Sequence, residues 1–387
     1  MSAPLVRHPG EYRWETRLLA VVTATLVAFG ITTVYGASSL VRTSGGYAGG
    51  AFALSQLSGA LIGGILMLTL SRMDYRVLRP LAWPILLATL VLLLIPVTPG
   101  IKNLLAKEVN GARRWVNLGV VSIQPSEIAK LAIVIWCAML ATKKGEGVRE
   151  FKKGLVPFLV VIGIVCALII GQPNMSMSVL VALLGGIVLF SAGAKIGHFL
   201  LLGFAGVVVG LQAIKFAGYR AARLDTFLNG ADGTSQIHQS LVGIGSGGIF
   251  GVGLGQGQQK LGYVSYAYSD FIFSTIGEEW GLIGICLIVF LYGLFCWVGF
   301  RIARSAEDPF GQYLATGLTA AVGVTAVLHM FVTLELMPTT GLTLPFISYG
   351  RSSLVVSLIG VGLLLSVGRM RGKPEKRASA AARRAEA

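Results

Sequence analysis

Long apolar runs separated by short polar stretches recur along the whole chain. The candidate membrane spans are Leu18–Leu40, Ala53–Leu70, Leu81–Val97, Ile128–Ala141, Leu155–Gly171, Met177–Ala192, Phe199–Phe216, Phe271–Phe300, Tyr313–Leu334 and Leu354–Val367. About 20 apolar residues cross the hydrocarbon core as a helix, so the pattern predicts an all-α integral membrane protein with about ten transmembrane helices. The fourth run is short, and its helix is expected to begin near Pro125 and to include Glu127.

Lysine and arginine concentrate beside alternate ends of these runs. The group comprises Arg7, Arg13, Arg17, Arg72, Arg76, Arg79, Lys143, Lys144, Arg149, Lys152, Lys153, Lys195, Arg301, Arg304 and the basic residues after Val367. Positive residues accumulate in cytoplasmic loops, so this face and both termini are predicted to be cytoplasmic. The chain then divides into a cytoplasmic segment (1–17), one membrane domain (18–368) and a basic cytoplasmic tail (369–387) expected to lack a fixed structure.

Composition supports the same class. The chain is 54% hydrophobic and 13% charged, whereas soluble domains carry about 25% charged residues. The net charge of +15 is spread over short loops. It therefore indicates topology and attraction to anionic lipid rather than binding to nucleic acid. The four cysteines lie in apolar spans and the four histidines are scattered, so neither type predicts a disulfide frame or a metal site.

The first polar segment on the outer side runs from Glu108 to Lys130. Glu127 and Lys130 are three residues apart and share one helix face, where they can form either a purely structural pair or part of a substrate site. Trp115 follows Arg113 and Arg114. This trio is either an interfacial anchor or a flat face for a sugar beside guanidiniums that bind phosphate.

Two further outer segments carry polar chemistry. The glycine-rich stretch 218–269, between the seventh and eighth spans, is predicted to lie along the membrane and to approach a ligand closely with its backbone. Its basic candidates for substrate binding are Arg220, Arg223 and Lys260. The stretch 337–353 contains two prolines and the turn that includes Ser348 and Tyr349, which are further candidates for substrate binding. Irregular backbone at membrane depth is expected to line a cavity or to be buried in protein.

Asp270 stands at the mouth of the eighth apolar run, on the same side as all three segments. An acid at the edge of the membrane is costly and is a candidate functional residue. The alternative is a solvent-facing acid favoured by the helix dipole. The convergence of polar segments on one side favours the functional interpretation.

Four stretches of this sequence resemble one known family. They are Asn110-Gly-Ala-Arg-Arg-Trp-Val-Asn-Leu-Gly119, Gln124-Pro-Ser-Glu-Ile-Ala-Lys130, Ser269-Asp-Phe-Ile-Phe273 with Gly277-Glu-Glu279, and Gly341-Leu-Thr-Leu-Pro-Phe-Ile-Ser-Tyr-Gly350. They are similar to motifs of the SEDS family (shape, elongation, division and sporulation), over about residues 18–369. The sequences of these motifs are more similar to those of the division branch of the family than to those of the elongation branch. The chain differs from the usual family motifs at Asn174, Tyr268 and Arg351.

The resemblance implies a glycosyltransferase of the bacterial inner membrane that polymerises lipid II into glycan strands on the outer face, at the division septum. It implies that Asp270 is the essential aspartate, acting as a general base in an inverting reaction. Glu127 and Lys130 occupy the family's Glu and Lys positions. Lys130 and the outer arginines would hold the pyrophosphate, with or without a divalent cation such as Mg²⁺ or Mn²⁺.

The resemblance also implies partners and leaves alternatives. A class B penicillin-binding protein is the expected transpeptidase partner, together with other membrane proteins of the division complex. Phe290, Leu294 and Val298 recur at four-residue spacing in the eighth span, and this stripe is either a docking face for the partner's membrane helix or a face toward lipid or the core. A flippase for the same lipid would also show embedded charges and broken helices. A non-catalytic scaffold would tolerate loss of Asp270.

Overall fold

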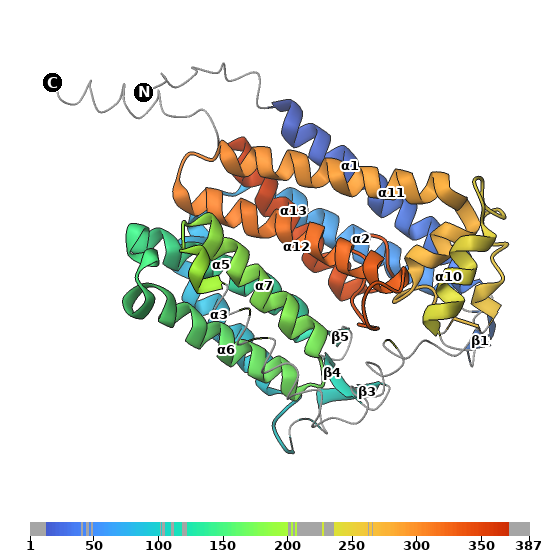
Figure 1. The fold of residues 1–387 in the computed structure, drawn as a ribbon, viewed down its shortest axis with the longest axis horizontal. Helices are drawn as coiled ribbons and strands as arrows, with labels where there is room; N and C mark the ends of the chain where they lie inside the picture. The colour runs from blue at the N-terminus through green and yellow to red at the C-terminus, as the bar shows by residue number, and fades with distance from the viewer. Residues whose placement is uncertain are drawn as a thin grey trace.

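The computed structural model is a bundle of membrane helices (Figure 1). It describes residues 13–39, 42–43, 46–47, 49–100, 102, 105–109, 112–117, 122–199, 203, 206, 227, 236–261, 263–264 and 266–370. Its helices are α1 (Arg13–Ser38), α2 (Gly49–Arg72), α3 (Leu78–Leu94), α5 (Pro125–Lys144), α6 (Val156–Gly171), α7 (Met175–Ser191), α10 (Gln236–Ser246), α11 (Ile272–Arg304), α12 (Pro309–Thr333) and α13 (Arg351–Arg369). Short turns of other helix types are η1 (Tyr75–Val77), η2 (Gly145–Arg149), η3 (Phe151–Leu155) and η4 (Gln259–Leu261).

These helices confirm the predicted membrane class. Within the described ranges, 8 helices are long and apolar enough to cross a membrane, and α7 is a shorter apolar helix. Every predicted span except Phe199–Phe216 coincides with one of them. Most of that span, most of the stretch 218–235 and the tail after Met370 lie outside the described residues. The fourth helix begins at Pro125, as expected from its proline and the following acid.

Both ends of the described chain lie at the same end of the bundle. Gly368 of α13 packs against Thr16 of α1. At this end Arg301 pairs with Glu15 at 2.7 Å, and Arg76 pairs with Glu307 at 2.6 Å. The basic residues that predict the cytoplasmic face therefore gather where the two chain ends meet.

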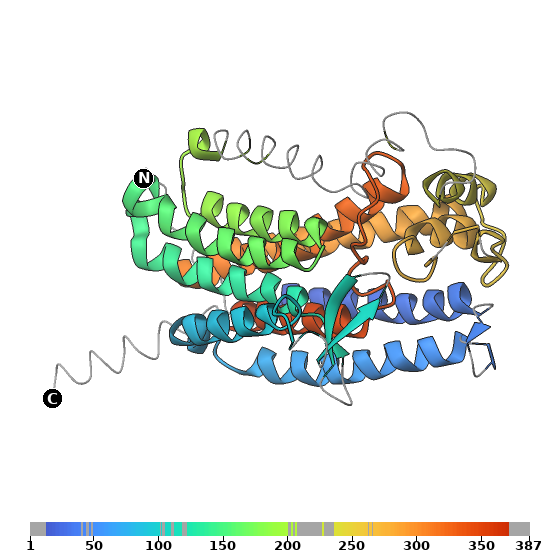
Figure 2. The same cartoon turned by 90° about the horizontal axis from the view of Figure 1, so that it is seen from below.

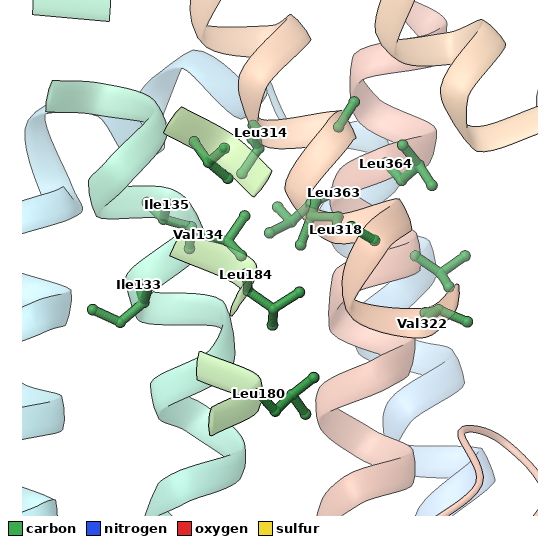
Figure 3. Close-up of a cluster of buried hydrophobic side chains, with 14 of the residues drawn as sticks. Ile133, Val134, Ile135, Leu180, Leu184, Leu314, Leu318, Val322, Leu363 and Leu364 are labelled. Carbon is green, nitrogen blue, oxygen red and sulfur yellow. The ribbon is translucent and has the colours of Figure 1, made fainter. Parts of the chain in front are cut away.

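The apolar core lies where four helices face one another (Figure 3). Side chains from α5, α7, α12 and α13 meet there, and they include Ile133, Val134, Ile135, Leu180, Leu184, Leu314, Leu318, Val322, Leu363 and Leu364. Helix α5 is buried along most of its length, so its polar first turn is held by apolar packing on several sides.

Helices α2 and α13 approach each other closely through glycines. A Cβ at Gly63 would lie 2.6 Å from the side chain of Leu358, and a Cβ at Gly362 would lie 2.7 Å from the backbone of Met67. Small residues allow such close packing between membrane helices. The opposite face of α2 is exposed at the edge of the bundle (Figure 2). The close contacts at Gly63 and Gly362 fix the register of α2 on α13.

The predicted eighth span is broken in the structure. Gly281 has φ 64° and ψ −160° inside α11, so the segment before it and the long apolar helix after it are separate. A Cβ at Gly281 would lie 2.4 Å from the backbone nitrogen of Gly251. The glycine-rich segment crosses α11 at this point, and the break accommodates it. Periodicity alone did not predict this break.

Two small sheets add strands to the predicted all-α fold. Strands β1 (Arg42–Thr43) and β2 (Gly46–Tyr47) form a hairpin. Strands β3 (Ala106–Val109), β4 (Ala112–Asn117) and β5 (Ser122–Ile123) form an antiparallel sheet in that order, between α3 and α5. The first polar segment is thus a sheet that leads directly into the buried first turn of α5.

Candidate active site

Asp270 lies in a tight turn immediately before α11. The carbonyl of Tyr266 accepts hydrogen bonds from the backbone nitrogens of Ser269 at 2.9 Å and Asp270 at 3.1 Å. Tyr266 has φ 58°, which is uncommon for a residue with a large side chain. The hydroxyl of Ser269 donates to Oδ1 of Asp270 at 3.1 Å. The carboxylate is partly buried, so it is not simply a solvent-facing acid at a helix start.

The connection between α12 and α13 packs on this turn. The hydroxyl of Ser348 donates to the carbonyl of Ser269 at 2.7 Å and accepts from the backbone nitrogen of Leu344 at 2.8 Å. The backbone nitrogen of Tyr349 donates to the carbonyl of Tyr268 at 3.0 Å. These hydrogen bonds join two turns that are far apart in the sequence. They engage the carbonyls of Tyr268 and Ser269, the two residues immediately before Asp270.

An aromatic cluster lies beside the same turn. The ring of Phe52 on α2 lies 4.8 Å from the rings of both Tyr268 and Tyr349, which are 5.7 Å apart. Burial raises the pKa of the Tyr268 hydroxyl, and the nearby carboxylate of Asp270 also raises it. Tyr268 therefore stays protonated at neutral pH within electrostatic reach of the Asp270 carboxylate.

The predicted pair at the start of α5 is present. Nζ of Lys130 lies 2.6 Å from Oε2 of Glu127, and the two side chains are only 8% and 4% exposed. The hydroxyl of the neighbouring Ser126 is buried and has no hydrogen-bond partner among the described residues. Pro125 opens the helix, and Glu127 lies in the first turn, where the helix dipole favours a negative charge.

The start of α5 and the Asp270 turn belong to one end of the bundle. The hydroxyl of Ser352, in the first turn of α13, donates to the carbonyl of Ser122 on β5 at 3.0 Å. Ser122 is three residues before Pro125, and Ser352 is three residues after Tyr349. Figure 1 shows the connection between α12 and α13 between α10 and the strands β4 and β5. The three predicted polar segments therefore converge at the same end of the bundle.

The arginines of β4 have structural partners. Nη2 of Arg114 donates to the carbonyl of Pro173 at 2.5 Å, which ties the sheet to the turn between α6 and α7. Arg113 pairs with Glu108 on β3 at 3.1 Å. Trp115 lies opposite Lys107 in the same sheet. None of these contacts joins β4 to the Asp270 turn, so a role for this trio in substrate binding stays a prediction.

The other predicted positions fall into two groups. Arg220 and Arg223 lie outside the described residues, as does the side chain of Lys260, whose backbone belongs to η4. Two positions that differ from the family motifs have structural roles. The side chain of Asn174 caps α7 by accepting a hydrogen bond from the backbone nitrogen of Met177 at 3.3 Å. Arg351 is the first residue of α13 and packs against Gly59 of α2.

The glycine-rich segment approaches the protein rather than an identified ligand. Backbone nitrogens of Val252 and Gly253 donate to the carbonyls of Glu278 and Glu279 at 3.0 and 3.1 Å. The buried carboxylate of Glu278 accepts from the backbone nitrogen of Gln258 at 2.6 Å. Close backbone approach was predicted for this segment, but the described contact is with the start of α11. Glu278 supports the segment, a role that sequence reasoning did not assign.

These features define a polytopic membrane protein with a polar site at one end of its helix bundle, built from an aspartate turn and a buried lysine–glutamate pair. The chain belongs to the cell cycle protein family of FtsW, RodA and SpoVE, whose model matches residues 16–373. The predicted resemblance to the SEDS family is thereby confirmed.

Individual relatives cover almost the whole chain. The probable peptidoglycan glycosyltransferase FtsW of Trichlorobacter lovleyi is 37% identical over 94% of this chain and 95% of its own. The stage V sporulation protein E of Bacillus subtilis is 36% identical over 91% of this chain and 96% of its own. Among solved structures, the rod shape determining protein RodA of Thermus thermophilus superposes with a TM-score of 0.67 at 28% identity, covering 92% and 97%. A chain of a peptidoglycan synthase complex superposes with a TM-score of 0.75 at 27% identity, covering 92% and 98%.

Proposed function

We propose that this protein is a peptidoglycan glycosyltransferase that polymerises lipid II at the outer face of the cytoplasmic membrane. The relatives named as probable peptidoglycan glycosyltransferases support this reaction class. The observation that carries the proposal is the hydrogen bond of 2.7 Å from Ser348 to the carbonyl of Ser269. It joins two polar turns around Asp270 at the end of the bundle opposite to the basic cytoplasmic face.

Asp270 is the proposed general base. It accepts the proton of a sugar hydroxyl on one lipid II while that oxygen attacks the anomeric carbon of another glycan. The bond from that carbon to the pyrophosphate oxygen breaks, and the polyprenyl pyrophosphate departs with the bonding electrons. Attack from the opposite face inverts the anomeric carbon. Pyrophosphate leaves well when cations bind it, so the reaction needs no separate general acid.

Lys130 is the proposed cation for the pyrophosphate. Its ammonium is buried, so its interaction with an anion is weakly screened by water. Glu127 orients it. Arg113, Arg114, Arg220, Arg223 and Lys260 are further proposed contacts for phosphate. The described residues contain no group of three or more His, Cys, Asp or Glu suited to a metal ion. A divalent cation, if the reaction uses one, would be held largely by the pyrophosphate oxygens.

Polymerisation of purified lipid II by the purified protein tests the function directly. We expect glycan strands on electrophoresis, and we expect their loss when the lipid substrate is omitted. Movement of labelled lipid II across a vesicle membrane without polymer formation would favour the flippase alternative. If the protein shows neither polymerisation nor lipid movement but binds its partners normally, the scaffold alternative is favoured.

A class B penicillin-binding protein is the proposed partner, because this chain superposes on a member of a peptidoglycan synthase complex. The division branch and a septal location are supported by the relatives named FtsW. Other division proteins are proposed as further partners. The stripe Phe290, Leu294 and Val298 on α11 was predicted as a docking face. That prediction is wrong for Val298, which is fully buried, whereas Phe290 is 63% exposed.

The exposed face of α11 instead includes Ile283, Leu287 and Phe290. In a background with Cys286 replaced by alanine, a cysteine introduced by Phe290→Cys is expected to cross-link to the membrane helix of the partner. Val298→Cys is the matched control on the buried face of α11 and is expected to give no cross-link. Cysteines are introduced in the same way at Ile283 and Leu287. If the two proteins co-purify but no cross-link forms at Ile283, Leu287 or Phe290, this face of α11 is excluded as the docking face.

A further inference from the structure

Gln56 of α2 joins the turn that holds the Asp270 segment. Its Nε2 donates to the carbonyl of Ser348 at 3.0 Å, and its Oε1 accepts from the backbone nitrogen of Gly350 at 3.2 Å. The residue is fully buried in the helix bundle. One amide thus satisfies two backbone groups on either side of Tyr349, and a hydrocarbon side chain of the same length would leave both unsatisfied.

The same face of α2 carries Phe52, one turn earlier. Its ring lies 4.8 Å from the rings of both Tyr268 and Tyr349. Residues four apart lie on the same helix face. Further along this face, Gly59 and Gly63 seat α2 against α13. The position of Gln56 along the bundle is therefore fixed by close packing of the two helices.

We propose that Gln56 is a positioning residue for Asp270. It fixes the turn at Ser348 and Gly350, and that turn holds Ser269 through the Ser348 hydroxyl at 2.7 Å. Tyr349 holds Tyr268 at the same time, through a backbone hydrogen bond of 3.0 Å. Gln56 is far from Asp270 in sequence and lies in an apolar span outside the three polar segments. This inference rests on the proposed function for its kinetic test, but its structural test is independent of activity.

Gln56→Met removes both hydrogen bonds at nearly constant volume. We expect kcat for lipid II polymerisation to fall by about 10- to 100-fold, because a small misplacement of a catalytic group costs this much. KM should change by less than about twofold, because the residue does not contact substrate. Hydrogen exchange in the peptides that contain residues 266–270 and 348–350 should increase. Ser58→Ala is the control on the same helix, since among the described residues its hydroxyl donates only to the carbonyl of Ser55, at 2.7 Å. It should match the parent in all three measurements.

Gln56→Glu supplies the rescue. A protonated carboxyl can donate to Ser348 and accept from Gly350, whereas a carboxylate can only accept. Its activity relative to the parent should therefore exceed that of Gln56→Met, and should increase from about pH 8 to about pH 6. If Gln56→Met does not fold, the shorter Gln56→Asn carries the same exchange measurement, because it cannot span both partners.

The outcomes separate the positioning role from the proposed reaction. An inactive parent with increased exchange in Gln56→Met would overturn the proposed function and support the structural link. An active parent with unchanged kcat and unchanged exchange in Gln56→Met would overturn the link alone. A fall in melting temperature without any change in exchange at residues 266–270 would indicate a merely structural amide and would also overturn it.

Discussion

Replacement of Asp270 by asparagine is expected to reduce glycan polymerisation by about 10²- to 10⁴-fold, the usual contribution of a general base. The side-chain oxygen of asparagine can still accept the hydrogen bond that Ser269 donates to Oδ1 at 3.1 Å. The turn before α11 should therefore persist, while proton transfer is lost. The measurement is the rate of glycan formation from saturating lipid II, together with the melting temperature of the variant.

Glu335→Gln is the matched control for this substitution. Glu335 is a partly buried acid just beyond α12, at the same end of the bundle. It makes no contact that is assigned to the reaction, so its replacement should change the rate by less than about twofold. If Asp270→Asn keeps most of the parent rate while the protein is fully folded, Asp270 is not the base.

The buried pair at the start of α5 gives the second large effect. Lys130→Met leaves Glu127 charged and buried, and Glu127→Gln leaves Lys130 charged and buried. Breaking a buried pair from one side costs about 3–5 kcal/mol of stability. The double variant removes both charges and should recover most of that loss. We expect it to remain inactive and to bind lipid II weakly, because the cation proposed for the pyrophosphate is absent.

The double variant separates a structural pair from a functional one. Thermal unfolding and lipid II binding are measured on the two single variants and the double variant. The control pair is Arg76 and Glu307, at the end of the bundle where the two ends of the described chain meet. Their side chains are 2.6 Å apart but partly exposed. Its removal should cost about 0–1 kcal/mol and leave lipid II affinity unchanged. A stable double variant with full lipid II affinity would assign the Glu127–Lys130 pair to structure alone.

The contacts around Asp270 explain why no single motif describes the site. Ser348 reaches Ser269 across 79 positions of sequence, and Gln56 reaches Ser348 across 292. Sequence reasoning found Asp270 and Ser348 because both stand in irregular polar stretches. It missed Gln56 because a single amide in an apolar run gives no periodic signal.

Local pattern was sufficient for the membrane spans that the structure describes and for the start of α5. Span length and the placement of basic residues are set by hydrocarbon thickness and by the cost of moving charge across it, and both can be read from a window of sequence. Pro125 and Glu127 marked the start of their helix because the first turn tolerates proline and favours an acid.

Tertiary structure alone decided three further features. Helix α11 is broken at Gly281 because the backbone of Gly251 crosses there. The apolar run is continuous in the sequence, so its pattern does not predict that crossing. Arg114 turned to the carbonyl of Pro173 because the sheet β3–β5 places it there. Asp270 became part of a site because the turn at Ser348, which Gln56 of α2 holds, packs against the turn before α11. The sequence by itself determined which residues could do chemistry, and the long-range hydrogen bonds determined which of them meet, because such bonds depend on chain segments that only the folded bundle brings together.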